Sequence, residues 1–423
     1  METLLPELFA SLYKDLNPEQ SAAMKILHGS ENVFITGGAG TGKSHLIRNY
    51  LKGTDPETVP VLASTGAAAV LVGGRTFHSF FGLGILEGGA EKSIERAVDN
   101  KRVARRIRKA NAVVIDEISM IPGEVLAAAE AVAAQCRNRK AEPWGGLKVI
   151  AVGDFAQLPP VTRGRQRKDW AFLNPVWQKS GFHCIQLKTM MRAKEDAEFC
   201  QFLNDVRRGD VTNRVEELLE WRTMLDGDAP SGATLLFARR NDALKVNYNK
   251  LAELPGDEHI FETIYSGNDH GIKSLKNNAP IEEKLVIKKN AFVMIRQNDP
   301  KKRWVNGSLG YVSKIDKHSL FVDLLNGNSV ELKQNSFSMQ DADGKEIAVA
   351  RNFPLSLAWA ITIHKSQGST LDKAVVNIAG LWEPGQAYVA LSRVKNSEGL
   401  FVSNWDRRSI QSDPNVQEFY RQF

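Results

Sequence analysis

Residues 37–44 read GGAGTGKS, a glycine-rich stretch that ends in a lysine and a serine. The apolar run NVFIT precedes it and a helical pattern follows it, a context that favours a phosphate-binding loop over a simple turn. Glycines let the backbone approach a phosphate, while the N–H groups at a helix start attract its charge. We predict that Lys43 reaches the β- and γ-phosphates of a nucleotide and that Ser44 ligates Mg²⁺. The whole predicted cradle is Gly37, Gly38, Ala39, Gly40, Thr41, Gly42, Lys43 and Ser44.

Two adjacent carboxylates, Asp116 and Glu117, close the apolar run AVVI. An Asp-Glu pair at a strand end is often only a turn, so the prediction depends on the phosphate loop upstream. Beside such a loop, we expect Asp116 to hold Mg²⁺ and Glu117 to orient or deprotonate the attacking water, because hydrolysis needs a positioned nucleophile. The pair therefore predicts that the bound nucleotide, which we expect to be ATP, is hydrolysed.

Two glutamines complete the predicted nucleotide site. Gln157, in GDFAQLPPV, follows another apolar run and is placed to sense the γ-phosphate or the attacking water. In the alternative reading, Asp154 and the prolines only shape a turn. Gln20, in LNPEQ, offers an amide donor and acceptor to the adenine edge, although a glutamine before a helix is common.

The elements that must position these residues alternate along the chain. Short apolar runs, namely NVFIT, VPVLAS, AVVID and LKVIAVGD, are separated by helical patterns up to about Cys184. This βαβ rhythm predicts a doubly wound parallel sheet whose strand ends face a ligand crevice. We therefore expect a first α/β domain over residues 1–184.

A second α/β rhythm follows in HCIQL, ATLLFA, AVVNI and GLFVS. Between residues 282 and 351 the sequence pattern changes to that of short strands, with the turn signals Asn306-Gly307, Asn326-Gly327 and Asp343-Gly344. We expect a small β-barrel over 282–351, inserted into a second α/β domain that comprises residues 185–281 and 352–423.

Composition is that of an ordinary globular protein: 423 residues, 43% hydrophobic and 25% charged. No apolar run approaches the ~20 residues of a membrane span. No secretory signal is visible either, so we expect a cytoplasmic protein, nucleoid-associated in a bacterium, without membrane contact. The formal charge of +6 favours a polyanionic partner. Cys136, Cys184 and Cys200 fit neither a metal site nor a disulfide framework, so we expect buried thiols.

Eight motifs, in chain order, carry a resemblance to known proteins. They are GGAGTGKS, ASTGAAA, TFHSFFGLG, VIDEISM, GDFAQLPPV, LNDVRRG, PLSLAWAITIHKSQGSTLD and AYVALSRV. The set resembles the superfamily-one DNA helicases and most closely the Pif-type branch, with RecD and the phage helicase Dda as more distant relatives. The resemblance runs from about Leu16 to about Phe401.

The resemblance implies two RecA-like domains that clamp ATP, a β-barrel inserted in the second, and 5′-to-3′ translocation along single-stranded DNA. It also implies that Arg192, in LKTMMRA, and Arg393, in ALSRV, contact the γ-phosphate, where a guanidinium stabilises transition-state charge. A surface salt bridge is the plainer alternative for either arginine. Gln367 and Gly368, in IHKSQG, and Gln386 are expected along the same cleft.

Further motif residues are predicted to contact a nucleic-acid strand through phosphate hydrogen bonds or base stacking. Core packing is the alternative for each phenylalanine. Basic residues gather in Lys101–Lys109, Thr162–Lys168 and Lys301–Trp304. The first stretch is predicted to be a solvated helix face, whereas the other two are candidates for a DNA channel. The predicted contact residues are Ser64, Thr65, Phe77, His78 and Phe80, with His364, Lys365, Ser366 and Thr370 placed by the family match.

We therefore expect an ATP-dependent DNA helicase of replication, repair or recombination. It would act on single-stranded DNA and on single-strand/duplex junctions, as a monomer or a weak self-associate. Two alternatives stay open: an RNA helicase, because no motif visibly reads the 2′-hydroxyl, and a nucleic-acid-dependent ATPase that remodels complexes without unwinding. The candidate strand-separating wedge lies at about residues 82–100. A binding module without turnover conflicts with the presence of Glu117.

Overall fold

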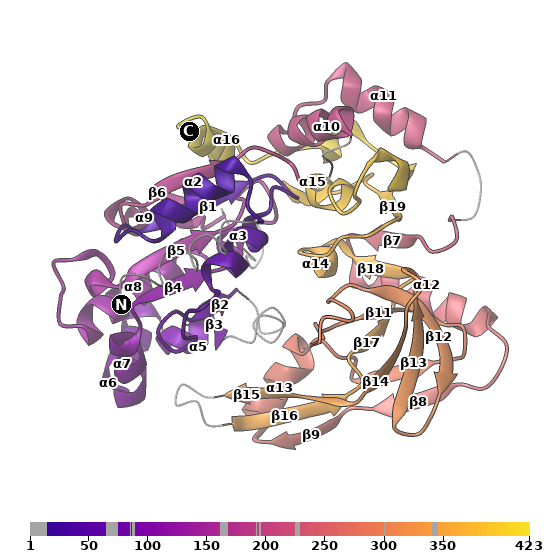
Figure 1. Ribbon diagram of the computed structural model, residues 1–423, viewed down its shortest axis with the longest axis horizontal. Helices are drawn as coiled ribbons and strands as arrows, with labels where there is room; N and C mark the ends of the chain where they lie inside the picture. Colours follow the sequence, from indigo (N-terminus) through magenta and orange to yellow (C-terminus); the bar gives the residue numbers. More distant parts are fainter. Residues whose placement is uncertain are drawn as a thin grey trace. The chain divides into compact units, whose positions relative to one another are not determined.

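The computed structural model describes residues 15–64, 75–84, 86, 89–160, 168–191, 193, 196–224, 229–299, 301–340 and 346–423. The chain divides into two compact units. The first comprises Met1–Glu195 together with Asp413–Phe423, and the second comprises Asp196–Ser412. Figure 1 follows the elements of both units along the chain. Within the described residues, no helix combines the length and the hydropathy that crossing a bilayer requires.

The first unit is built on a six-stranded parallel sheet in the order β3-β2-β4-β5-β1-β6. The central strands β1 and β4 are buried at every residue, as expected for a parallel sheet covered on both faces. The predicted doubly wound sheet is confirmed. Its strands are β1 (Val33–Gly37), β2 (Val61–Ala63), β3 (Arg75–Thr76), β4 (Ala112–Ile115), β5 (Lys148–Val152) and β6 (His183–Leu187).

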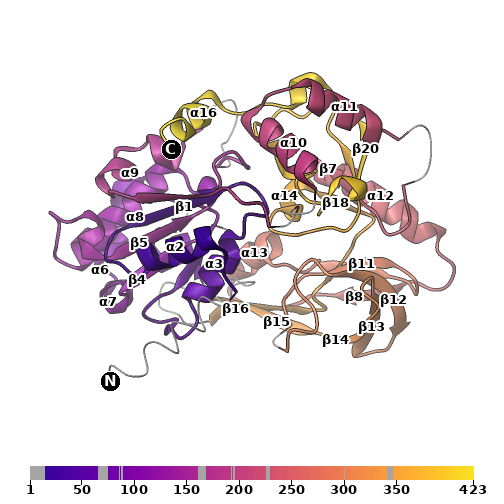
Figure 2. The ribbon, with the colours of Figure 1, turned by 45° about the horizontal axis from the view of Figure 1, so that its top comes forward.

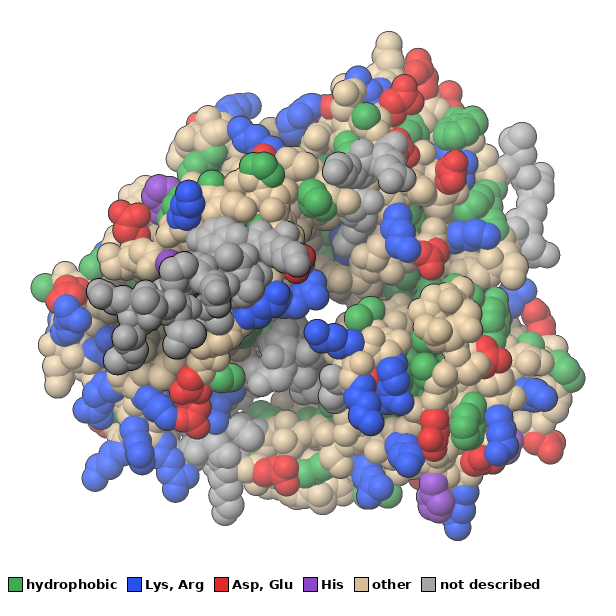
Figure 3. All heavy atoms as spheres, viewed as in Figure 1, with side chains coloured by type: hydrophobic (Ala, Val, Ile, Leu, Met, Phe, Trp, Pro, Cys, Tyr) green, Lys and Arg blue, Asp and Glu red, His purple; other side chains and the backbone are tan. Residues whose placement is uncertain are grey.

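Helices flank this sheet, and the alanine-rich α8 is buried over most of its length. On α7, Val103 and Ile107 point into the unit, while the Lys and Arg side chains gather on the surface, as Figure 3 shows. This confirms the predicted solvated helix face except at Arg106, which is half-buried and donates to the carbonyl oxygens of Phe80 and Ser79. The helices are α2 (Pro18–Leu27), α3 (Lys43–Tyr50), α5 (Phe77–Phe81), α6 (Ala90–Asp99), α7 (Lys101–Lys109), α8 (Gly123–Cys136), α9 (Pro175–Lys179) and α16 (Pro414–Tyr420). Short 3₁₀ turns cover Ile118–Met120, Pro143–Gly146 and Ala171–Leu173.

The second unit contains a four-stranded parallel sheet in the order β18-β7-β19-β20. With the first sheet, this gives the expected α/β fold class with two RecA-like parts. Its strands are β7 (Thr234–Phe237), β18 (Ala360–Thr362), β19 (Ala374–Asn377) and β20 (Leu400–Asn404). Its helices are α10 (Ala197–Arg208), α11 (Asn213–Arg222), α12 (Arg240–Glu253), α14 (Ile363–Ser366) and α15 (Gln386–Leu391), with 3₁₀ turns at Ser397–Gly399 and Arg407–Ser409.

A β-rich insertion lies between α12 and β18. A five-stranded antiparallel sheet in the order β14-β13-β12-β11-β17 forms around a core that includes Trp304 and Phe353. The turn signal Asn326-Gly327 is confirmed, because Gly327 joins β13 to β14 with φ +88°. The elements are β8 (His259–Glu262), β9 (Ile264–Gly267), α13 (Asp269–Asn278), β10 (Lys284–Ile287), β11 (Phe292–Ile295), β12 (Leu309–Ile315), β13 (Ser319–Leu324), β14 (Ser329–Lys333), β15 (Asn335–Gln340), β16 (Glu346–Asn352) and β17 (Leu355–Leu357).

The observed boundaries of these parts differ from the predicted ones. A boundary at 184/185 would cut β6, which pairs with β1 along its whole length and therefore belongs to the first unit. Residues 413–423 were expected in the second domain, yet they belong to the first unit. The insertion begins earlier than residue 282, because β8 pairs with β10 and β9 pairs with β16.

The insertion is also not a closed barrel in its hydrogen bonding. Among the described residues its strands form three sheets, of five, three and two strands. In the largest of them β14 and β17 are the edges, and they do not pair with each other. The predicted β-rich insertion is therefore present, with wider bounds and an open sheet.

The cysteines agree only in part with the prediction. Cys136 is buried, whereas Cys184 and Cys200 are half-buried. Loss of hydration still raises the pKa of all three thiols, and that of Cys184 reaches about 12. Thiols with raised pKa values are poor nucleophiles, so the inert role expected for these residues fits their surroundings.

Candidate nucleotide and nucleic-acid sites

The predicted phosphate loop joins β1 to α3. Gly42 stands at the N-cap of α3 in the left-handed region, with φ +87°. A Cβ atom on Gly42 would lie 2.3 Å from Gln20 Nε2, and one on Gly37 would lie 2.4 Å from the Leu187 carbonyl oxygen. Gly37 therefore has no room for a side chain against the fixed backbone of Leu187, and Gly42 favours glycine because of its left-handed φ.

The side chain of Lys43 bends back onto the backbone of the phosphate loop. Lys43 Nζ donates hydrogen bonds to the carbonyl oxygens of Gly37 at 2.7 Å and Gly38 at 3.1 Å. Thr41 Oγ1 also donates to the Gly38 carbonyl, at 2.9 Å. The ammonium group is thus held within the loop whose N–H groups are predicted to bind phosphate.

The two carboxylates after β4 have distinct surroundings. Burial raises the pKa of Asp116, and this is opposed by the Glu117 N–H, which donates to Asp116 Oδ1 at 3.0 Å, and by the charge of Lys43. Glu117 adopts φ +53° and ψ +50°, a left-handed conformation that is unfavourable for a residue with a Cβ. Such backbone strain at a carboxylate is a feature of functional sites.

Three of the predicted motifs meet at one edge of the first sheet. β4, β5 and β1 are neighbours and run parallel, so their carboxyl ends lie together. The turn after β5 packs directly on the turn after β4, since a Cβ on Gly153 would lie only 3.0 Å from Ile118 Cγ2. Gln157 is buried in that turn, and its N–H donates to the Asp154 carbonyl oxygen at 3.0 Å.

Gln20 has a structural role that the sequence did not reveal. Its Oε1 accepts from Asn17 N at 3.2 Å, while its own N–H donates to Asn17 Oδ1 at 2.8 Å, which forms a capping box at the start of α2. Its Nε2 donates to the carbonyl oxygens of Thr41 and Gly42. The side chain therefore supports the phosphate loop, and its contact with adenine stays a prediction.

The residues at this edge suit a magnesium ion. Ser44 offers a hydroxyl oxygen and Asp116 a carboxylate whose burial leaves its charge in need of a cation. Oxygen ligands match Mg²⁺, which in nucleotide sites takes only one or two protein ligands beside the phosphates. Within the described residues, no group of three or more His, Cys, Asp or Glu side chains is arranged to hold a metal.

Arg393, in the second unit, is buried and hydrogen-bonded to its own surroundings. Its Nε donates to the Val389 carbonyl oxygen at 2.7 Å, and its Nη2 donates to Ser392 Oγ at 2.9 Å. Its Nη1 donates to the carbonyl oxygen of Ser366 at 3.3 Å and to that of Ser369 at 3.4 Å. The alternative of a surface salt bridge is therefore wrong for Arg393.

The other residues predicted beside Arg393 vary in exposure. Gly368 has φ +76° with open space around it, and Gln367 is half-buried. Gln386 is only 1% exposed, and its Oε1 accepts from Glu383 N. Arg192, predicted to act with Arg393, lies outside the described residues.

Comparisons with known proteins identify the family. A sequence model described as PIF1-like helicase matches residues 15–217. Over 409 residues the chain is 52% identical to the protein named ATP-dependent DNA helicase Pif1 from Bdellovibrio bacteriovorus, covering 97% of this chain and 92% of that one. The chain belongs to the PIF1-like helicase family.

The chain is similar to several solved structures of this family. The Pif1 helicase from Candida albicans is 33% identical, with a TM-score of 0.81 over 96% of this chain and 99% of that one. The Bacteroides Pif1 helicase in complex with ADP-AlF3 and single-stranded DNA is 28% identical, with a TM-score of 0.70 over 96% of this chain and 97% of that one.

In the first unit of this family member, the predicted nucleic-acid contacts separate into two groups. Phe77 is 0% exposed and Phe80 is 3% exposed, so both rings are core residues and their prediction as stacking surfaces is wrong. His78 and Ser64 are half-buried, and partial burial lowers the pKa of His78. Thr65 lies outside the described residues. Only His78 and Ser64 therefore remain as described candidates in this unit.

In the second unit, the segment around α14 shows a similar separation. His364 and Lys365 are exposed, and Lys365 Nζ lies 3.4 Å from Glu282 Oε1. Thr370 is half-buried. Ser366 is 0% exposed, and its Oγ donates to the Ile363 carbonyl oxygen at 2.7 Å. The Ser366 hydroxyl is therefore bonded within its own helix, and the DNA contact that the family match assigned to Ser366 stays a prediction.

The other basic stretches add little to a DNA channel. Trp304 is a core residue of the insertion, and Arg303 binds Asp299, with Nε 2.8 Å from Oδ2. Lys301 and Lys302 are exposed. Residues 162–167 lie outside the described residues.

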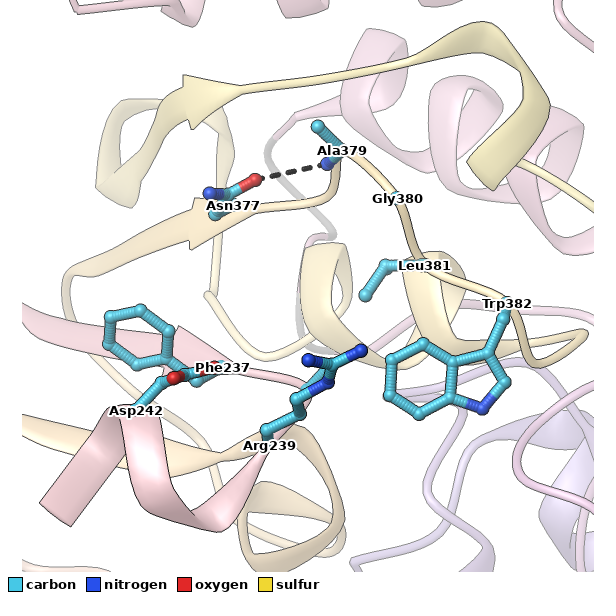
Figure 4. A pocket seen from close by; sticks show the side chains of 9 residues that line it. Phe237, Arg239, Asp242, Asn377, Ala379, Gly380, Leu381 and Trp382 are labelled. Atoms are coloured by element: carbon cyan, nitrogen blue, oxygen red, sulfur yellow. Dashed lines mark hydrogen bonds between the residues drawn. The ribbon is translucent and has the colours of Figure 1, made fainter.

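Sequence reasoning missed a pocket at the carboxyl ends of β7 and β19. Its volume is about 260 Å³, and Figure 4 shows Arg239 and Trp382 among the side chains that line it. The Arg239 guanidinium carbon lies 5.5 Å from the centre of the Trp382 ring, and that ring is 53% exposed. Nothing in the local sequence distinguishes Trp382 from a core tryptophan.

Proposed function

We propose that this family member is an ATP-dependent DNA helicase that moves 5′ to 3′ along single-stranded DNA and separates strands at junctions. Its B. bacteriovorus relative is named an ATP-dependent DNA helicase, and the Bacteroides relative was solved with ADP-AlF3 and single-stranded DNA. One observation in this chain carries the proposal. The phosphate loop, the Asp116-Glu117 pair and the Gln157 turn converge at the carboxyl edge of one parallel sheet.

The residues at this edge have separate roles in ATP hydrolysis. The loop N–H groups and Lys43 bind the phosphates, and Gln20 contacts adenine. Ser44 and Asp116 would hold Mg²⁺, and the chemistry such an ion would supply is neutralisation of charge on the phosphates. Glu117 accepts a proton from the attacking water or orients it, while Gln157 reports the presence of the γ-phosphate.

Arg393 couples the nucleotide site to the segment that contacts DNA. A guanidinium on the γ-phosphate stabilises the transition state, and we assign this role to Arg393 together with Arg192. In the structure, however, Arg393 Nη1 donates to the carbonyl oxygen of Ser366, directly after the exposed His364 and Lys365. Movement of the guanidinium toward a phosphate would break this bond and release the segment that contacts DNA.

The proposed DNA contacts are the exposed and half-buried motif residues. Ser64, Thr65 and Thr370 donate hydroxyls to phosphates, and Lys365 contributes charge. Loss of hydration lowers the pKa of His78 and of His364, which favours the neutral imidazole, so we assign stacking or a hydrogen bond to both rings.

A strand-displacement assay with 5′ and 3′ overhangs tests this function. We expect ATP-dependent unwinding of the DNA substrate with a 5′ overhang, at a rate per molecule that does not depend on protein concentration if a monomer is active. Absence of ATP-dependent unwinding on either DNA substrate would refute the proposal. Unwinding on matched RNA tracks but not on DNA would instead identify an RNA helicase, and ATPase activity without unwinding would identify a remodelling ATPase.

A further inference from the structure

The last helix, α16, docks on the first unit although the residues immediately before it belong to the second. Figures 1 and 2 show it lying on the first unit in both views. Phe419 packs among aromatic rings, with its ring centre 4.5 Å from that of Phe172 and 5.4 Å from that of Phe155. Trp170 Nε1 donates to Asp413 Oδ2 at 3.0 Å, at the start of the helix. Two kinds of contact therefore fix α16 in place.

The hydroxyl of Tyr420, at the end of α16, enters the buried edge of the sheet. It donates to Asp154 Oδ1 at 3.1 Å and accepts from the Phe155 N–H at 2.9 Å. Thr36 Oγ1 lies 2.7 Å from the same oxygen. Because a tyrosine hydroxyl has one proton and two lone pairs, these contacts match its capacity when Thr36 is the second donor.

These partners lie next to the proposed catalytic residues. Thr36 directly precedes Gly37, the first residue of the phosphate loop, and Asp154 begins the turn that contains Gln157. Thr36 and Asp154 are both 0% exposed, so in the folded chain the tyrosine hydroxyl rather than bulk water satisfies them. One hydroxyl therefore connects the ends of the neighbouring strands β1 and β5.

We propose that Tyr420 is a positioning residue for ATP hydrolysis, which sets the turn at residues 153–157 against the phosphate loop. This inference rests on the proposed function, because it assumes that Gln157 acts on the γ-phosphate. Without the hydroxyl, Thr36 and the Phe155 N–H lose a buried partner, and the turn relaxes to find another. Asp154 keeps its contact with the Ala156 N–H, so the turn shifts rather than unfolds.

The Tyr420→Phe variant removes the hydroxyl and keeps the ring. We expect kcat for single-stranded-DNA-stimulated ATP hydrolysis to fall about tenfold or more, since small misplacements of reacting groups are costly. The KM for ATP should stay within about twofold, because the phosphate loop itself keeps its glycines and Lys43. The control is Asp413→Ala, which perturbs the same helix but leaves the Tyr420 hydroxyl in the chain.

The Asp413→Ala variant loosens the docking of α16 through Trp170 and does not touch the Tyr420 hydroxyl. It should lower the melting temperature and leave kcat near that of the wild type when both are assayed well below melting. If the two variants lose kcat in proportion to their loss of melting temperature, Tyr420 is merely structural and the proposal is wrong.

Hydrogen exchange supplies a readout that does not depend on activity. In Tyr420→Phe the Phe155 amide loses its acceptor, so we expect the peptide covering residues 154–157 to exchange at least about tenfold faster than in wild type. Unchanged exchange there would overturn the inference. A wild-type chain without ATPase activity would instead refute the proposed function, and the exchange result would still decide whether Tyr420 holds this turn.

Discussion

The predicted nucleotide site of the first unit and the motif residues of the second unit are held in opposite ways. In the first, Glu117 and Gly42 both have positive φ angles. This backbone places the Glu117 carboxylate and the N–H groups of the phosphate loop at the end of a sheet. In the second, Arg393 and Ser366 are buried and bonded to nearby backbone. A motif match therefore locates both regions, but it does not say which atoms act on a ligand and which shape the chain.

Glu117→Gln gives the sharpest test of the first region. If Glu117 is the general base, turnover should fall by up to about 10⁴-fold, because glutamine cannot accept the proton. Nucleotide binding should persist, since Lys43 and the loop are unchanged. Steady-state ATPase rates and equilibrium binding of a fluorescent ATP analogue measure the two quantities. Glu124→Gln, an exposed carboxylate at the start of α8, is the matched control and should behave as wild type.

Arg393→Ala tests whether the second region also takes part in chemistry. We expect ATPase activity to fall about 10³-fold if the guanidinium reaches the γ-phosphate. The melting temperature should fall as well, because the carbonyl oxygens of Val389, Ser366 and Ser369 each lose one donor. Ser392→Ala removes one partner of Arg393 and leaves its charge, so it should affect stability more than rate. Lower stability with normal turnover for Arg393→Ala would make the arginine purely structural.

Much of the first unit follows from the sequence, because its signals are local. The apolar runs before Gly37 and after Ala112 predict buried parallel strands, and the glycine spacing predicts the loop between β1 and α3. The boundary near residue 184 was wrong for a non-local reason. β6 belongs to the sheet only because it pairs with β1, which lies about 150 residues earlier.

The functional residues also divide into those that local sequence predicts and those that depend on distant parts of the chain. Lys43, Asp116 and Glu117 could be predicted, since their roles follow from their position beside the loop. Burial could not be predicted for Phe77 or Ser366, because it depends on what the rest of the chain brings to them. Tyr420 gave no signal at all, since its partners Thr36 and Asp154 are more than 250 residues away.

The LNDVRRG motif of the second unit should contribute to stability rather than to turnover. Asp205 is buried and accepts hydrogen bonds from Arg208 at 2.6 Å, Thr212 at 2.9 Å and Arg214 at 3.1 Å. Asp205→Ala should therefore lower the free energy of unfolding by about 1–3 kcal/mol, as measured by calorimetry. Asp210→Ala breaks only an exposed ion pair to the same Arg208, so it should cost less than about 1 kcal/mol. A larger effect for Asp210 would contradict this assignment.

The smallest expected effect lies in the insertion, far along the chain from both motif regions. The Arg303 side chain donates to Asp299 and holds the pKa of that carboxyl at about 2, below its ordinary 3.8. Because the folded pKa is depressed, this stabilisation is complete above pH 3.8 and disappears as pH falls toward about 2. The effect should be small, since Arg303 is half-exposed and solvent screens the pair. Asp299→Asn should therefore lower the melting temperature slightly at pH 7, and its difference from wild type should vanish in acid. ATPase activity at neutral pH should be unchanged, and a loss of turnover would show that the insertion is coupled to the nucleotide site.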